Sequence, residues 1–224
     1  NSNFEEYYNQ NLDINKFKFD FKKISLSDSL FDLEKLLNIS KNYLSRLSAQ
    51  ELFNKLDVYT KEFDLDFNKL INKYQEYTVN VLNIEREIKK PRKDFSSLSE
   101  IKNHIWYMYD ELFKDLNYDF QTINDLSEID LILKEYLKYY QENDSQEEWF
   151  EKIKELSEKM GYAKDLKLYK ENHSNYKGHV GDIAMVLRVS LTSKSMTPNL
   201  YDIMKLLGKN RIEERINILI HKKS

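Results

Sequence analysis

The sequence contains no cysteine and very little glycine or proline, with four and two residues respectively out of 224. The absence of cysteine excludes a disulfide framework and any thiolate metal site, and it fits a reducing compartment. So few of the residues that break helices favour a helix-rich protein with short connections. The sequence also lacks an apolar run long enough to cross a membrane and a signal-peptide pattern at its start. We therefore expect no membrane partner.

Charge is unevenly distributed along the chain, although the formal net charge is only −3. Residues 176–224 carry nine basic and four acidic side chains, whereas the rest carries 26 basic and 34 acidic ones. A second basic cluster lies within residues 86–93. Two basic regions in an acidic chain indicate a local contact with a polyanion. A solvated charged surface is the commoner explanation when the charge distribution is the only observation, and this alternative stays open.

Several helix starts are marked by capping residues. Ser48–Glu51, Ser97–Glu100 and Ser145–Glu148 match the capping box, in which the serine accepts the N3 amide and the glutamate reaches back to the N-cap amide. Asp125 offers a similar N-cap. Apolar residues follow at helical spacing, and we interpret these stripes as core. By contrast, phenylalanine alternates with charged residues over positions 17–21, which predicts a short strand or extended segment.

Residues 176–216 hold most of the few turn-forming residues. A first helix is predicted from Gly181, and Arg188 lies one residue beyond its apolar face, so its guanidinium is expected at the helix edge. Thr197–Pro198 form an N-cap and first-turn pair for a second helix, which Gly208 ends in the left-handed conformation. The positive end of that helix would suit a phosphate or a base edge. A plain helix–loop–helix hairpin explains the same pattern.

This stretch resembles the C-terminal end of bacterial glutamyl-tRNA synthetases, which are class I aminoacyl-tRNA synthetases. Residues 188–193 are similar to the family's Arg-x-Ala-Leu-Thr-Gly run, 197–200 to its Ser/Thr-Pro-x-Leu helix start, and 207–211 to its Leu-Gly-Lys-x-Arg. Residues 30–36 resemble the Phe-Asp-x-x-Lys-Leu segment after the catalytic domain. Residues 84–94 are similar to a basic segment of the first anticodon-binding subdomain.

The resemblance implies an all-α fold with a helical cage. A remnant of the stem-contact region would occupy residues 1–48, and two helical anticodon-binding subdomains would occupy 49–122 and 123–224. The partner would be tRNA-Glu, gripped by its anticodon arm, with no DNA bound, and the protein would be a cytoplasmic monomer.

The catalytic half of the family, with its ATP motifs, is absent from this sequence. ATP and Mg therefore belong to the parent glutamate–tRNA ligase, and the fragment has no cofactor, catalytic residue or metal site of its own. Because the chain begins with Asn1 rather than Met, we expect a piece of a longer protein. This piece alone should be inactive.

The resemblance assigns the C-terminal stretch to base recognition. It implies that Arg188 makes forked hydrogen bonds to a base or phosphate. Thr197, Pro198 and Leu200 would shape the pocket that receives an anticodon base, through backbone groups and apolar contact. The family's glycine after Leu-Thr is Ser193 here, which predicts a tighter or differently turned loop.

The basic segment carries a second set of expected contacts. Arg86 or Arg92 would match the basic residue that reads the third anticodon position, and the gap lengths leave both open. How that position is read decides whether tRNA-Gln also binds. Lys89, Lys90 and Lys93 would attract phosphates in a salt-dependent way. Since Pro91 disfavours a helical conformation for the residue before it, we expect these cations on a loop or helix start.

Two other classes of function stay open from the residues alone. One is a helical protein-interaction module without an RNA role, which would be favoured if the two basic regions lay on opposite faces. The other is a self-contained enzyme. The four histidines are too far apart in sequence for a helical metal pair, and no Ser/His/Asp or glycine-rich phosphate motif is present, so the enzyme is the weaker alternative.

Overall fold

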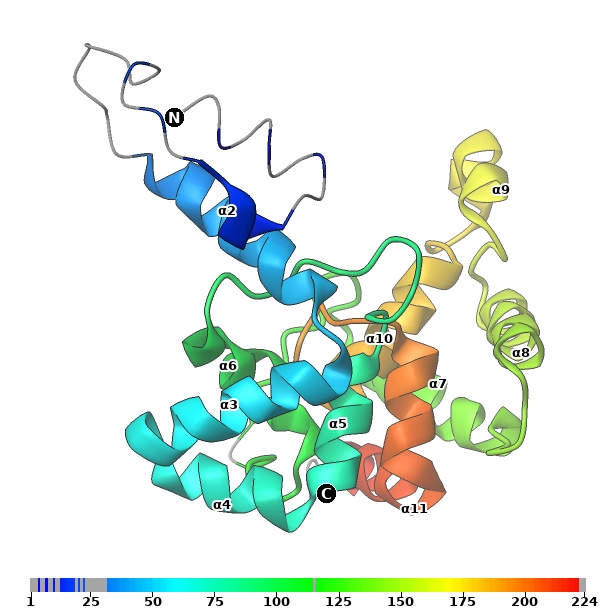
Figure 1. The fold of residues 1–224 in the computed structure, drawn as a ribbon. Helices are drawn as coiled ribbons and strands as arrows, with labels where there is room; N and C mark the ends of the chain where they lie inside the picture. Colours follow the sequence, from blue (N-terminus) through cyan, green and yellow to red (C-terminus); the bar gives the residue numbers. More distant parts are fainter. Residues whose placement is uncertain are drawn as a thin grey trace. The chain divides into compact units, whose positions relative to one another are not determined.

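The computed structural model describes residues 4, 7, 10, 13–18, 20, 22, 32–114 and 116–221 of the chain. Regular structure in these residues is helical (Figure 1). Their one sheet-type pairing is an isolated parallel bridge between Ala163 and His179. The expected all-α fold is thus confirmed. Within the same residues, no helix combines the length and apolar character that crossing a bilayer requires.

The α-helices of the described residues are α2 (Leu33–Arg46), α3 (Ala49–Phe63), α4 (Leu65–Lys73), α5 (Gln75–Asn83), α6 (Ile101–Ile105), α7 (Leu126–Tyr139), α8 (Gln146–Lys159), α9 (Leu166–Glu171), α10 (Val180–Thr192) and α11 (Leu200–His221). Short 3-10 turns are η1 (Ile14–Lys16), η3 (Leu98–Glu100), η4 (Trp106–Met108) and η5 (His173–Asn175).

The chain divides into two compact units, residues 1–39 and 40–224. In the first unit the rings of Phe4 and Tyr7 each lie 5.2 Å from the ring of Phe17 and meet it edge-on. Such edge-to-face contacts are the favoured geometry of aromatic pairs.

Two sequence-based expectations concern this part of the chain. The strand expected over residues 17–21 includes residues 19 and 21, which lie outside the described residues. The predicted limits 1–48, 49–122 and 123–224 stay predictions.

The second unit is built around one continuous hydrophobic core. Helix α3 packs against α4 and α5, while α10 packs against α7, α8 and α11. Helix α11 also contacts α5, so it joins the two groups. Figure 1 shows α3 and α4 (cyan) on one flank and α8 and α9 (yellow-green) on the other. Fully buried side chains from helices across the unit form this core, among them Leu52, Leu56, Ile101, Ile132, Ile153, Ile183 and Ile212.

Capping explains where several of these helices begin. Ser48 caps α3, with its backbone N–H donating to the Glu51 carboxylate at 2.8 Å and its hydroxyl accepting the Glu51 N–H at 3.2 Å. The capping box at Ser145 is also present, and Asp125 caps α7 as expected.

The capping box predicted at Ser97 is wrong. The carboxylate of Glu100 instead accepts the backbone N–H of Ser96 at 2.8 Å and the Ser96 hydroxyl. Ser97 therefore precedes a 3-10 turn without capping it.

A buried guanidinium connects α11 with the end of α10 and with η4. Arg215 is only 3% exposed. Its Nη1 donates to the carbonyls of Tyr107 at 2.8 Å and Leu191 at 2.7 Å, and its Nη2 donates to Asp110 at 3.0 Å. Burial lowers the pKa of Arg215, and the adjacent carboxylate partly offsets this effect. The protein can keep this positive charge in its interior because the donors of the guanidinium have hydrogen-bond partners.

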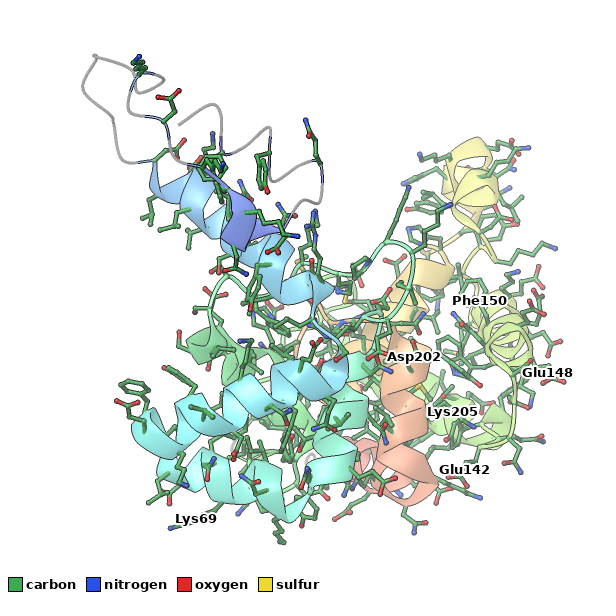
Figure 2. The ribbon with its side chains drawn as sticks, in the orientation of Figure 1. Lys69, Glu142, Glu148, Phe150, Asp202 and Lys205 are labelled. Carbon is green, nitrogen blue, oxygen red and sulfur yellow. The ribbon has the colours of Figure 1, made fainter. Side chains whose placement is uncertain are left out.

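The backbone at Gly208 divides α11 into two segments. Gly208 has φ 74° and ψ 163°, which is non-helical, so the predicted helix end at this residue is confirmed. Two residues beside the kink bind Glu142. Lys205 Nζ donates to the backbone carbonyl of Glu142 at 2.8 Å, and the Lys209 N–H donates to the Glu142 carboxylate at 3.2 Å. Figure 2 shows Lys205 and Glu142 on this face. Arg215 lies in the second segment, after the kink, and is buried.

Replacing Gly208 with alanine should lower the free energy of unfolding by about 1–3 kcal/mol, because this region of backbone conformation is essentially restricted to glycine. A Cβ at this position would meet only Glu142 Oε1, at 3.7 Å, so the cost is conformational rather than steric. Urea unfolding of Gly208→Ala measures the change. The exposed neighbour Asn210 provides the control, and Asn210→Ala should stay within about 0.5 kcal/mol of the wild type. Equal stability of the two variants would contradict the argument.

Candidate nucleic-acid interface

The basic segment after α5 forms a loop, as the sequence predicted. Lys89, Lys90 and Lys93 are exposed in it, and Arg92 is half-buried. The loop turns at Glu85, whose φ of 52° is left-handed, and its carbonyl accepts the N–H of Arg92 at 3.1 Å. A non-glycine residue in this conformation carries a local backbone strain that the surrounding contacts must offset.

The guanidinium of Arg92 contacts two carboxylates. Its Nε and Nη2 form a fork on Asp94, with distances of 2.9 Å and 2.8 Å to the carboxylate oxygens. Its Nη1 lies 3.5 Å from Glu85 Oε2. Hydrogen bonding to Asp94 raises the pKa of Arg92 further, so the group is a permanent cation.

Arg86 lies in the interior instead. It is 7% exposed, and its Nη1 donates to the carbonyls of Leu44 at 2.7 Å and Leu47 at 3.2 Å. Its Nε donates to the carbonyl of Leu82 at 2.8 Å. Burial lowers its pKa. These three carbonyls lie at helix ends, where acceptors lack partners within the helix, so Arg86 is occupied with holding the fold.

Arg188 binds the loop between α10 and α11. It is half-buried, and its Nη1 donates to the carbonyl of Pro198 at 2.9 Å and to both oxygens of Thr197. Ser193 ends α10 in the left-handed conformation, with φ 56°. Its hydroxyl donates to the carbonyl of Asn117 at 2.7 Å, and Lys194 Nζ donates to the carbonyl of Asn103. The loop is thereby attached to Asn103 and Asn117.

The predicted cap of α11 at Thr197–Pro198 is wrong by two residues. Asn199 caps the helix, since its Oδ1 accepts the N–H of Tyr201 at 2.9 Å. The N–H of Asn199 donates to Glu85 Oε2 at 3.0 Å, which joins this helix start to the basic loop. Leu200 is 4% exposed and packs in the core.

A pocket of about 250 Å³ lies where these two segments meet. Of the residues predicted from the sequence, Arg86, Arg92, Thr197 and Pro198 line it. Arg188, Leu200 and the three lysines are not part of its lining. The volume is slightly below the roughly 300–1,000 Å³ of drug-sized ligand sites. It therefore suits a group smaller than a drug-sized ligand.

Ten further residues of the lining escaped the sequence reasoning. Five of them are Glu85, Asp94, His104, Lys194 and Met196, and the other five are the apolar side chains of Val81, Leu82, Ile84, Phe95 and Ile105. His104 meets Phe95 edge-on at 5.3 Å, and burial, followed by the charge of Lys194, lowers its pKa. It is therefore neutral at neutral pH and can donate or accept a hydrogen bond. Of these residues, only Asp94 could have been predicted from the sequence, because an acidic residue two positions after an arginine in an extended loop can pair with that arginine. Met196 is the most exposed large apolar residue of those the structure describes, at 84%.

The pocket thus combines an apolar lining with two carboxylates and with cationic and neutral hydrogen-bonding groups. Hydroxyl and carbonyl oxygens at Thr197 and Pro198 add polar atoms to one wall. The described residues hold no group of histidine and carboxylate side chains placed to bind a metal ion. The arrangement is suited to hydrogen bonding with a ligand that presents donors and acceptors together.

Sequence comparisons place these features in a family. The profile described as "Anticodon binding domain" matches residues 69–220, which include the whole pocket. The chain is 39% identical to a glutamate–tRNA ligase of Acetivibrio thermocellus over 98% of its length. Identity is 36% to that of Clostridium perfringens strain 13 and 32% to that of Sorangium cellulosum, over 96% of the chain in each case. The chain spans about 40% of the length of these relatives.

The buried position of Arg86 yields a stability prediction. Arg86→Met keeps the volume but removes the donors to three carbonyls, and we expect unfolding free energy to fall by about 2–3 kcal/mol. Chemical denaturation measures this, with Lys61→Met on the exposed face of α3 as the control. If Arg86→Met kept wild-type stability and lost only RNA affinity, Arg86 would be a ligand contact and not a structural residue.

Proposed function

The chain belongs to the anticodon-binding domain family, and we propose that it binds the anticodon arm of tRNA-Glu as a monomer. In the parent protein it would serve a glutamate–tRNA ligase, the activity named for its relatives. The transfer of glutamate with ATP and Mg would then take place outside this chain, which spans about 40% of those relatives. The chain's own contribution is recognition.

One observation carries the proposal: the pocket between residues 85–104 and 194–198 joins the two basic regions of the chain. Proteins read RNA sequence mostly from unstacked loop bases, whose edges present donors and acceptors to side chains. A small pocket with carboxylates, a guanidinium and backbone carbonyls offers complementary groups. The anticodon is such a loop.

Each predicted residue receives a role under this proposal. Arg92, half-buried at the pocket, is the base reader, in preference to Arg86, whose donors are engaged with main-chain carbonyls. Thr197 and Pro198 form the opposite wall, and Arg188 holds them in place.

The exposed lysines have a different role. Lys89, Lys90 and Lys93 would attract RNA phosphates without reading sequence, in a salt-dependent way. Leu200 supports the wall from the core.

The alternative of a protein-interaction module without an RNA role is less well supported. Basic regions on opposite faces of the protein would favour this alternative. Arg92 and Lys194, one from each region, instead border the same pocket. The family and its relatives also point to tRNA.

Filter binding of the chain to three RNAs tests the proposal. The RNAs are tRNA-Glu, tRNA-Gln and a tRNA-Glu that carries an unrelated anticodon. We expect the anticodon replacement to weaken binding by about 1–3 kcal/mol, or roughly 5- to 150-fold, the range for losing good base contacts. The affinity for tRNA-Gln then shows whether the protein also discriminates against this tRNA. Equal affinity for all three at fixed salt would reduce the protein to nonspecific RNA binding, and no binding would favour the interaction module.

A further inference from the structure

Both edges of the Arg92 guanidinium face acidic groups, although this residue is the one best placed to meet RNA. Asp94 takes the Nε–Nη2 edge through a short fork, and Glu85 lies 3.5 Å from Nη1. The side chain of Arg92 is still 38% exposed, so a ligand can reach it. The contact with Asp94 is the bidentate geometry in which carboxylates pair most strongly with arginine.

Glu85 cannot easily move away from this arrangement. Its Oε2 also accepts the N–H of Asn199 at 3.0 Å, at the start of α11. The backbone of the same residue accepts the N–H of Arg92 and holds the left-handed conformation of the turn. The second carboxylate is thus built into the loop.

This pairing changes what the pocket can bind. A phosphate that approached Arg92 would meet two carboxylates beside the cation, and the repulsion would oppose the attraction. A nucleobase edge is neutral and presents both donors and acceptors. A carboxylate can accept from an amino group of the base, while the guanidinium donates to a ring nitrogen or carbonyl oxygen.

We propose that Asp94 is a specificity-determining residue, which with Glu85 keeps Arg92 from phosphates and makes the pocket select a base edge. The proposal rests on the tRNA-binding function put forward above and adds the means of discrimination. Specificity of this kind arises because unwanted ligands meet a repulsive group, as well as because the right ligand is attracted. The exposed lysines of the loop remain the phosphate contacts.

Asp94→Asn is the direct test, because it removes the charge and keeps the size and one acceptor oxygen. Filter binding uses the 224-residue chain with tRNA-Glu and with tRNA-Glu that carries an unrelated anticodon, over a salt series. We expect the affinity ratio between the two RNAs to fall about tenfold, mainly because the mismatched RNA binds more tightly. The slope of log affinity against log salt should steepen by about 0.7, which corresponds to one more phosphate contact with a single strand.

Asp66→Asn is the matched control. Asp66 lies on α4 with its side chain 97% exposed, so the variant changes net charge by the same amount away from the pocket. It should leave both the ratio and the slope close to wild type.

A double-variant cycle separates the proposed role from a structural one. In an Arg92→Gln background, Asp94→Asn should change the affinity ratio and the salt slope no more than Asp66→Asn does, because the shielded cation is gone.

The proposal is overturned if Asp94→Asn matches Asp66→Asn in the wild-type background, if it weakens the binding of both RNAs equally, or if its effect persists without Arg92. Circular dichroism checks the fold of each variant. An unfolded Asp94→Asn would make Asp94 a structural residue and overturn the proposal as well. Failure of the proposed function itself is seen separately, as equal binding of both RNAs by the wild type.

Discussion

The buried guanidinium of Arg215 holds together the elements that form the pocket. Its donors pair with the carbonyl of Tyr107, which follows His104 closely, and with that of Leu191, which precedes the loop at Ser193. Removing one partner of a buried charge costs several kcal/mol, so the two walls are coupled through the core. Arg215 lies in the segment of α11 that follows the kink at Gly208.

Above this core, the pocket is preorganised by contacts between its own walls. Glu85 accepts the first N–H before α11, Lys194 binds the carbonyl of Asn103, and Arg188 binds the loop oxygens. Groups that are already ordered lose less conformational entropy when a ligand binds. The same contacts leave Arg92 paired with carboxylates, so the free protein offers an array of donors and acceptors in place of a bare cation.

Short-range chemistry could be predicted from the sequence at most helix starts, although not at Ser97, and long-range chemistry could not. The cap at Ser48 depends on a glutamate three residues away, and it is present. Thr197 looked equally good as a cap, but Arg188 takes its oxygens and a later asparagine caps the helix. Arg86 and Arg92 look alike in the sequence. Only the carbonyls of a helix end about forty residues earlier decide which one is buried. Family resemblance selected four of the residues that line the pocket, but neither their meeting in one pocket nor its carboxylates followed from the sequence.

The most direct test of the account is hydrogen exchange of the chain with and without tRNA-Glu. If an anticodon base enters the pocket, backbone amides of residues 85–95 and 193–199 should be protected on binding. Amides of the outer face of α8 should exchange as in the free protein. Protection centred on α8 and α9, with the pocket segments unchanged while tRNA-Glu is bound, would contradict the account.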